Sequence, residues 1–173
     1  MKAIIEKYGI QNIWHFTDRS NWNSIQQHGG LLSLKKLNDR GIDIPMPGGN
    51  DWSHEADENR GLDKYVHLTF VSNHPMLYVA QQELRITNPI WLKIDVTVLM
   101  DLRVRFCSSV ANGNGAKLLS HQEAVDEIDF EVLFTRMDWH NSEIHNRRNA
   151  AEKSEILVPD MVRLDKILGC YNG

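Results

Sequence analysis

The sequence predicts a mixed α+β domain in which short strands alternate with short helices. Its 173 residues are 42% hydrophobic and 24% charged, which suits one compact unit, so we expect residues 1–173 to form a single domain. Runs of β-branched and aromatic residues recur between turn-forming residues, which is typical of short strands. No apolar run approaches the roughly 20 residues that cross a bilayer, and the N-terminus lacks a secretory pattern, so we expect a cytoplasmic protein without a membrane partner.

Net charge limits the ways in which the chain can meet nucleic acid. It carries 19 Lys and Arg residues against 23 Asp and Glu residues, a formal net charge of −4. A protein that coats DNA through a broadly basic surface needs the opposite balance. Any contact with nucleic acid must therefore be local.

The first third of the chain predicts a strand, a short helix and a second extended segment. Residues 13–17 are dense in β-branched and aromatic types, and the polar residues 18–21 offer a helix N-cap. The helix should end at Gly29 and Gly30, which tolerate positive φ, before an extended stretch over 31–34.

Residues 35–60 change character. They combine glycines, prolines and an acidic string with few candidates for a core. We expect a long mobile loop, because structureless segments longer than about 12 to 15 residues in a compact domain are usually lids or binding loops. A plain surface insertion is the equal alternative.

The remaining elements follow from composition and spacing. Residues 65–70 form the clearest predicted strand, and Pro75 opens a helix that runs from 76 to about 83. Another strand is expected over 90–98, and helical spacing extends from 123 to 134. The segments 156–158 and 162–168 have the composition of strands.

Two common chemistries find no support in the motifs. The eight histidines include no HExxH pattern and no pair spaced to share one helix face, so we expect no metal centre. No GxxxxGK[ST] sequence exists either, and Gly113-Asn114-Gly115 lacks the strand and helix context of a dinucleotide fingerprint. Metal catalysis and phosphate-cradling glycine loops are therefore disfavoured.

Polar side chains recur on strand faces instead. The period of two places His15 and Thr17 on one face of their strand and Trp14 and Phe16 on the other. The strand 65–70 repeats the pattern with Tyr65, His67 and Thr69, and a third strand begins at Glu155. An isolated histidine of this kind is usually bonded to a core carbonyl. Three such strands favour a functional site.

Three segments of the chain, in order, resemble the DarT family of DNA ADP-ribosyltransferase toxins. The first is Ile13-Trp14-His15-Phe16-Thr17 with residues 21–33, which is similar to the family's His-x-Thr strand, short helix and Leu-rich exit. The second is the strand 65–70 followed by Pro75-Met76-Leu77-Tyr78. The third is Met137-Asp138-Trp139, a polar loop, and the glutamate strand 153–158.

The resemblance implies an ADP-ribosyltransferase fold, a split β-sandwich with peripheral helices that holds NAD as co-substrate in a cleft. It also implies transfer of ADP-ribose to a base of single-stranded DNA. Loss of nicotinamide leaves positive charge on the ribose, which a fixed carboxylate stabilises, and Glu155 is the candidate. His15 and Thr17 then bind NAD beneath the covering loop 35–60.

Other roles are assigned through the same resemblance. An aromatic ring from Tyr65, Phe70 or Tyr78 should cover the nicotinamide. The family's arginine near the diphosphate and ribose corresponds to Arg40 or Arg60, and we favour Arg60 as the catalytic one. The polar loop 138–153 should recognise the substrate, since arginines beside a tryptophan suit single strands. Its candidate residues are Trp139, His140, His145, Asn146, Arg147 and Arg148.

The leading hypothesis is a toxin paired with an antitoxin, an ADP-ribosyl-hydrolase of the macrodomain type, that reverses the modification. The target base, thymine or guanine, is left open. One alternative is an enzyme of the same fold that acts on RNA, a tRNA 2′-phosphate or a protein. A second is a non-catalytic module that binds a nucleotide or a partner.

Overall fold

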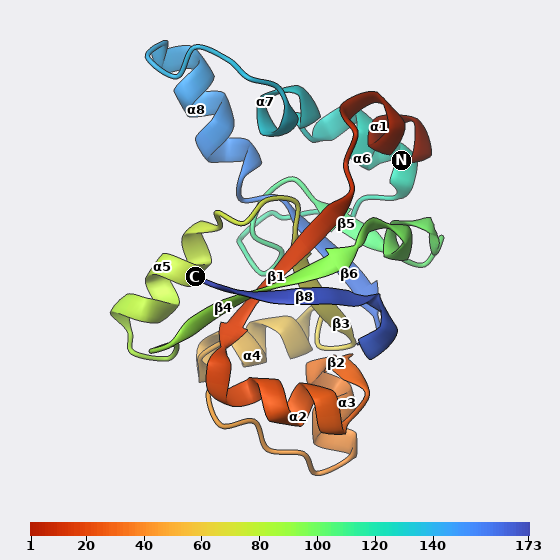
Figure 1. Cartoon of the computed structure of the whole chain (residues 1–173), viewed down its shortest axis with the longest axis vertical. Coiled ribbons are helices and arrows are strands. Elements are labelled where there is room, and N and C mark those ends of the chain that lie inside the picture. Colours follow the sequence, from red (N-terminus) through yellow and green to blue (C-terminus); the bar gives the residue numbers. More distant parts are fainter.

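The structure, a computed structural model, describes the backbone of residues 1–173 and the side chains of residues 1–50 and 53–173. A six-stranded antiparallel sheet crosses its middle, and helices gather at both ends (Figure 1). The mixed helix and sheet architecture predicted from the sequence is confirmed. None of the described helices is long and apolar enough to cross a bilayer.

The large sheet has the strand order β5-β6-β3-β1-β4-β8. Its strands are β1 (Asn12–Asp18), β3 (Tyr65–Thr69), β4 (Pro89–Asp95), β5 (Arg105–Cys107), β6 (Glu155–Pro159) and β8 (Ile167–Asn172). A second sheet pairs β2 (Gly30–Leu32) with β7 (Met161–Arg163). All of these pairings are antiparallel.

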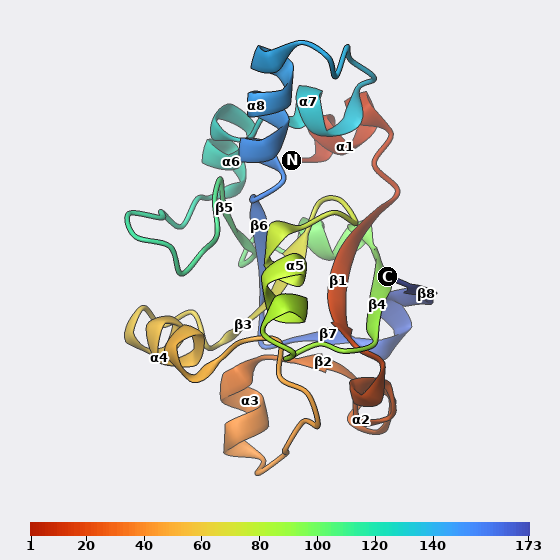
Figure 2. The ribbon, with the colours of Figure 1, turned by 90° about the vertical axis from the view of Figure 1, so that its left-hand side faces the viewer.

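The large sheet is nearly divided at its centre. β1 pairs with β4 along all seven of its residues, but its register with β3 consists of Trp14 opposite Thr69 alone. Two halves, β5-β6-β3 and β1-β4-β8, therefore diverge from one shared point (Figure 2). This is the split that the predicted fold requires.

Buried apolar residues explain why these segments become strands. Ile13, Val66, Leu68 and Ile156 are at most 4% exposed and belong to one core cluster. β6 is buried from Glu155 to Val158, which is why its sequence reads as a continuous apolar run rather than an alternating one. The predicted strands at 13–17, 65–70 and 156–158 are thus confirmed, with boundaries shifted by one or two residues.

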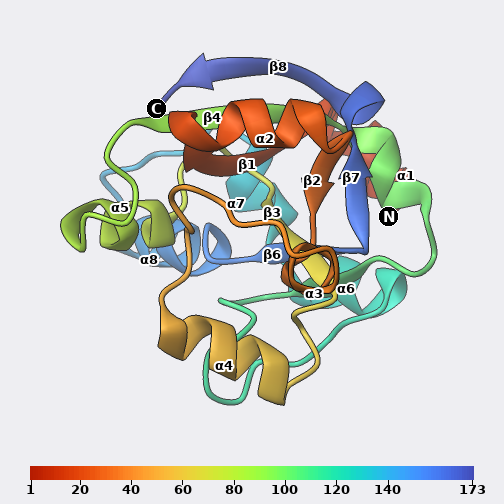
Figure 3. The same cartoon turned by 90° about the horizontal axis from the view of Figure 1, so that it is seen from below.

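Helices occupy the two ends of the molecule separately. One end holds α1 (Lys2–Tyr8), α6 (His121–Glu127), α7 (Phe130–Phe134) and α8 (Ser142–Ala151). The other end holds α2 (Trp22–Gln27), α3 (Leu34–Asp39) and α4 (Asp51–Asn59), which are nearest the viewer in Figure 3. α5 (Pro75–Gln82) lies beside the sheet, and its predicted start at Pro75 is confirmed.

The prediction of a structureless loop over 35–60 is wrong, because the segment contains α3 and α4. Each helix begins with a side-chain cap: Ser33 Oγ accepts a hydrogen bond from the Lys36 amide, and Asn50 Oδ1 accepts one from the Ser53 amide. These caps satisfy amides that would otherwise be unpaired, so short polar helices form without a large apolar face.

The predicted loop over 138–153 is also wrong. Its residues 142–151 form α8, which begins where Asn141 accepts hydrogen bonds from the amides of Glu143 and Ile144. Three further boundaries differ from expectation. The single helix predicted over 123–134 is two helices with a break at residues 128–129, the strand over 90–98 turns into a 3₁₀ helix after Asp95, and 164–166 is a 3₁₀ turn between β7 and β8.

Candidate active site

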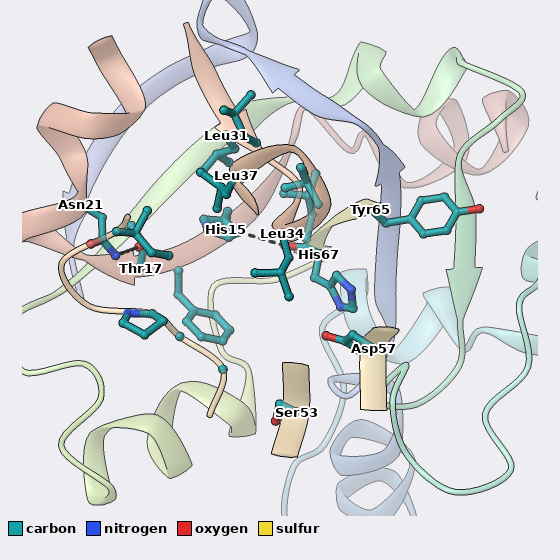
Figure 4. Close-up of a pocket in the computed structure, with 18 of the residues that line it drawn as sticks. His15, Thr17, Asn21, Leu31, Leu34, Leu37, Ser53, Asp57, Tyr65 and His67 are labelled. Atoms are coloured by element: carbon teal, nitrogen blue, oxygen red, sulfur yellow. Dashed lines mark hydrogen bonds between the residues drawn. The ribbon is translucent and has the colours of Figure 1, made fainter. Parts of the chain in front are cut away.

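A cleft of about 270 Å³ lies where the two halves of the sheet diverge. Residues of β1 and α2 line one side, and residues of β3 with Glu155 line the other. The segment from α3 to α4 lines it as well through Leu34, Leu37, Ile44, Pro47, Gly48, Gly49, Ser53, His54 and Asp57 (Figure 4). The region predicted to cover the cofactor is therefore at the cleft, although it contains two helices.

β1 contributes His15, whose protonation state is set by its surroundings. Its Nδ1 donates a hydrogen bond to the main-chain carbonyl of His67 at 2.9 Å. Burial lowers the pKa of His15 to about 4, so the ring is neutral near pH 7. A neutral ring that donates through Nδ1 keeps a lone pair on Nε2, and His15 can therefore accept a hydrogen bond from a ligand.

Thr17 and Asn21 form a second polar pair on this side. Asn21 Nδ2 donates to Thr17 Oγ1 at 2.9 Å and to the Met46 carbonyl at 2.7 Å, and Asn21 Oδ1 accepts from the Met46 amide at 3.0 Å. One asparagine thus fixes the chain at Met46 against α2. The Thr17 hydroxyl, which accepts from Asn21, retains its proton for donation to a ligand.

Glu155 is the carboxylate of the cleft. It begins β6 opposite Thr69 of β3, and its side chain is 8% exposed. Oε2 accepts a hydrogen bond from His67 Nδ1 at 2.9 Å, and Oε1 lies 3.9 Å from His74 Nε2. The carboxylate is therefore fixed on one oxygen, while the other oxygen has no contact as short as a hydrogen bond among these groups.

The electrostatics of this group come from close packing of like and unlike charges. Burial works against a charge on His67, but its hydrogen bond to Glu155 and the nearby charges of Glu155 and Asp57 outweigh burial and raise the pKa of His67. Burial raises the pKa of the Asp57 carboxyl and lowers that of His74. A carboxylate held in such a site stabilises positive charge more strongly than it would in water.

Of the residues predicted to bind NAD or to catalyse, His15, Thr17, Tyr65 and Glu155 line the cleft. The Tyr65 ring points away from His15 and His67 (Figure 4) and packs beside Leu62 and Leu157. It stands at the rim, and the nicotinamide-covering role predicted for it requires a change of rotamer.

Phe70 and Tyr78 do not meet the cleft, so the role predicted for them is wrong in this structure. Phe70 is 1% exposed and packs against Phe106 and Phe130 in the core. Strand alternation places it on the face opposite His67 and Thr69. Tyr78 is 66% exposed on the outer side of α5.

The two candidate arginines also lie outside the cleft. Arg40 is exposed at the C-terminal end of α3. Arg60 donates hydrogen bonds to the carbonyls of Gly113, at 2.6 Å, and Ala116, which joins the end of α4 to the loop after β5. None of the described residues that line the cleft is an arginine or a lysine.

The predicted substrate residues all lie on or just before α8, at the end of the molecule opposite α2 and α3 (Figures 1 and 2). Trp139, His140, His145 and Asn146 are exposed. Arg147 bonds to Asp129 at 2.7 Å and Glu131 at 2.8 Å, and Arg148 bonds to Glu152 and to two main-chain carbonyls of α7. Both arginines serve the packing of α8 on α7.

The sequence interpretation did not single out three side chains that the structure places in the cleft: His74, Asn21 and Asp57. Strand parity did place His67 on one face with Thr69, but it gave His67 no role. His74 precedes Pro75 and caps α5 through Nδ1. That local pattern predicts the cap but not the position of His74 beside Glu155.

An antiparallel sheet that splits over a cleft, with a buried glutamate at the start of an inner strand, defines the class of ADP-ribosyltransferase domains. Comparison with known proteins specifies the class further. The family model of DarT, described as ssDNA thymidine ADP-ribosyltransferase, matches residues 14–172. The chain belongs to the DarT family, and it is an NAD-dependent ADP-ribosyltransferase that acts on single-stranded DNA.

Solved structures from Thermus sp. 2.9 and Thermosipho africanus share the fold. Thermus sp. 2.9 DarT in complex with ADP-ribosylated ssDNA has 18% sequence identity and a TM-score of 0.67, and the match covers 92% of this chain and 79% of that one. The same protein in complex with NAD⁺ has 18% sequence identity and a TM-score of 0.60, and the match covers 91% of this chain and 79% of that one. Thermosipho africanus DarTG in complex with ADP-ribose has 18% sequence identity and a TM-score of 0.72, and the match covers 94% of this chain and 44% of that one. No curated protein matches the sequence.

Proposed function

We propose that NAD binds in the cleft between the two halves of the sheet and that Glu155 is the carboxylate that promotes loss of nicotinamide. The observation that carries the proposal is the place of Glu155: it is buried at the split and fixed on one oxygen by His67. The bond between ribose C1′ and nicotinamide breaks, and its electron pair leaves with nicotinamide. The positive charge that develops on the ribose is stabilised by the carboxylate.

The acceptor in this proposal is a ring nitrogen of thymine, the base in the family's description. The nitrogen lone pair forms the new bond to C1′, and the proton on that nitrogen passes to a base and then to solvent. In this proposal Glu155 takes that proton through Oε1, which is the oxygen that His67 leaves unbonded. One NAD and one DNA base thus give one modified base, nicotinamide and a proton.

His15 and Thr17 are proposed to hold the dinucleotide. Both lie on the cleft face of β1, and His15 offers an acceptor where Thr17 offers a donor. Main-chain amides and polar side chains of the cleft are proposed to hold the diphosphate. The covering segment from α3 to α4 completes the cleft on that side.

The exposed residues of α8 are proposed to contact nucleotides that flank the target base. α8 ends at Ala151, four residues before Glu155, and extends away from the sheet (Figure 2). A helix of ten residues is about 15 Å long, so its far end lies several nucleotides from the reacting base. Trp139 and His140 can meet a single strand there, and Arg147 and Arg148 support the helix instead.

The protein is proposed to be the toxin of a toxin and antitoxin pair in the cytoplasm. The matched Thermosipho africanus structure is named DarTG and contains ADP-ribose. A partner with a macrodomain that removes ADP-ribose from DNA would make the modification reversible. Co-expression tests this: the partner should restore growth to cells that the isolated chain arrests.

The decisive experiment is mass spectrometry of single-stranded oligonucleotides after incubation with NAD. Wild-type protein should add the mass of ADP-ribose to strands that contain thymine and release an equal amount of nicotinamide. Glu155→Gln should lower the rate about 1,000-fold while NAD still binds. Glu127→Gln, which changes an exposed carboxylate on α6, serves as the matched control and should react like wild type.

Other targets define the contradicting results. RNA oligonucleotides of the same sequence and a protein mixture are incubated in parallel. Adducts on RNA or protein but not on DNA would overturn the proposed acceptor. NAD binding without any adduct or nicotinamide release would indicate a non-catalytic nucleotide-binding module.

A further inference from the structure

We propose that His67 is a positioning residue of the reaction: it binds one oxygen of Glu155 and so presents the other oxygen to the nicotinamide ribose. This inference rests on the proposed role of Glu155. It adds a residue whose part in the reaction follows from contacts in the cleft, and it predicts how the rate depends on pH.

The contact between the two side chains is direct and enclosed. His67 Nδ1 donates to Glu155 Oε2 at 2.9 Å, and the Glu155 side chain is only 8% exposed. Adjacent antiparallel strands hold them, because Thr69 of β3 pairs with Glu155 of β6 and His67 lies two residues away on the same face. Main-chain pairing therefore fixes the geometry, and the hydrogen bond selects one carboxylate orientation.

The opposite side of each group is without a partner. His67 Nε2 and His74 Nε2 are buried and have no hydrogen-bond partner in the described part of the chain. Glu155 Oε1 faces His74 Nε2 at 3.9 Å, which is beyond hydrogen-bond distance. A ribose hydroxyl between these two atoms could donate to Oε1 and accept from His74, and this would use the oxygen that His67 leaves available.

Several titratable groups face His67 from the surrounding elements. Glu155 comes from β6, Asp57 from α4 and His74 from the start of α5, and the His15 ring bonds to the His67 carbonyl from β1. His15 and His74 are held neutral by burial, and burial also raises the pKa of the Cys107 thiol beside Glu155 to about 12. The net charge around His67 is therefore negative, which favours its protonated form.

This arrangement sets the sign of the pH effect. A protonated His67 cancels part of the negative charge of Glu155, whereas a neutral His67 still donates through Nδ1 and leaves that charge intact. Because the developing ribose charge is positive, the rate should rise as pH increases through the raised pKa of His67. The hydrogen bond that orients Glu155 persists on both sides of this transition.

Two substitutions separate orientation from charge. His67→Ala removes the donor and should lower the transfer rate about 10- to 100-fold, with the Kd for NAD within about threefold of wild type. His67→Asn keeps an N–H donor near the position of Nδ1 but cannot be protonated. It should recover most of the rate and lose the rise between pH 6 and pH 8.5 that wild type shows.

The measurements are single-turnover transfer to a thymine oligonucleotide over that pH range, NAD affinity by calorimetry, and Tm as a check of folding. His121→Asn changes a histidine outside the cleft and should keep the wild-type profile. Wild-type rate and pH profile in His67→Ala would overturn the inference. Equal loss of NAD binding in His67→Ala and His67→Asn would overturn it too, because it would make His67 a binding residue.

A further readout separates this inference from the proposed function. The imidazole of His67 can be titrated by NMR in wild type and in Glu155→Gln, where its pKa should fall. An unchanged His67 titration would refute the pairing even in a protein that transfers nothing. A wild-type protein that forms no adduct on any strand would instead overturn the proposed function, while the titration still decides the pairing.

Discussion

The cleft and the α7–α8 end of the molecule differ in how they treat polar side chains. At the α7–α8 end, Arg147 and Arg148 are bonded to carboxylates and carbonyls of neighbouring segments. In the cleft, Asp57 Oδ1 and one ring nitrogen each of His67 and His74 are buried without a partner among the described residues. An unpaired buried polar group costs about 1 to 3 kcal/mol. The polar groups of the cleft can therefore gain hydrogen-bond partners when a ligand binds, whereas the arginines of α8 already have theirs in the folded chain.

This difference shows which polar side chains are available to bind a ligand. Residue types alone favoured the arginine-rich α8 segment as a binding surface, yet its guanidinium groups are occupied. The cleft has fewer charges, but its groups converge and remain unsatisfied. Substitutions in the two regions should therefore separate, with effects on stability at α8 and on binding or rate in the cleft.

Among the effects that test this comparison of the two regions, the largest is expected on stability at α8. Arg147→Ala combined with Arg148→Ala removes the bonds to Asp129 and Glu131 and those to the α7 carbonyls. Loss of the Arg148 bonds should lower the free energy of unfolding by about 2 kcal/mol, or Tm by about 4 to 8 °C. Calorimetric scanning measures this, and Arg136→Ala, at an exposed arginine just after α7, is the control. An unchanged Tm with loss of DNA modification would restore the predicted DNA-binding role of these arginines.

Next in size is the effect of His15→Ala on cofactor affinity. Removal of the Nε2 acceptor should weaken NAD binding about tenfold, which corresponds to about 1.4 kcal/mol. Titration calorimetry with NAD measures it, and His121→Ala is the comparison outside the cleft. Unchanged affinity would return His15 to a purely structural role through its bond to the His67 carbonyl.

The third effect concerns stability in acid. The folded-state pKa of His15 is about 4, and that of His74 is also lowered by burial, whereas both are near 6.5 when unfolded. Below pH 6.5 the unfolded chain gains protons that the folded chain does not, so the free energy of unfolding should fall between pH 6.5 and pH 4. His67 acts oppositely, because its raised pKa gives a contribution that is full below pH 6.5 and lost above it.

Denaturant unfolding at several pH values tests this dependence. His15→Gln should make the fall between pH 6.5 and pH 4 shallower, since one of the two responsible groups no longer titrates. An identical slope in wild type and variant would mean that the pKa of His15 is the same in the folded and unfolded chains. That result would contradict the burial of its ring in the folded protein.

The smallest expected effect is at Trp139. Its ring is 44% exposed and lies under the Arg148 guanidinium, 5.4 Å from the centroid. Trp139→Ala should reduce modification of a long oligonucleotide about threefold, through lost stacking, and leave a very short one unaffected. If Trp139→Ala and wild type modified both lengths at equal rates, Trp139 would be excluded from contact with the strand.

The sequence was sufficient for the strands and much of the cleft. β1, β3 and β6 carry local patterns that survive in the fold, and strand parity correctly placed His15 and Thr17 together on the cleft face. The same parity argues against Phe70, since it alternates with Thr69, so this error was avoidable. The prediction for Tyr78 was wrong for a different reason: α5 buries Leu77 and Ala80, and Tyr78 is exposed to solvent.

The missed helices and missed neighbours have physical explanations. α8 buries only Ala151, so it has no apolar stripe to indicate a helix, and it depends on its Asn141 cap and on Arg148. α3 and α4 begin at the caps Ser33 and Asn50. In a segment with many polar residues, these caps do not stand out in the sequence. The position of His74 and Asp57 near Glu155 depends on contacts between segments distant in the chain, which no local pattern encodes.

The single residue pair between β1 and β3 has a consequence for the empty and occupied protein. Main-chain groups that border the split cannot all be satisfied by a neighbouring strand, so solvent or a ligand must complete them. A dinucleotide seated there would contact both halves at once and join them more firmly than the backbone does. The two halves of the sheet would then be held together while NAD is bound and would be freer to move apart after it has reacted.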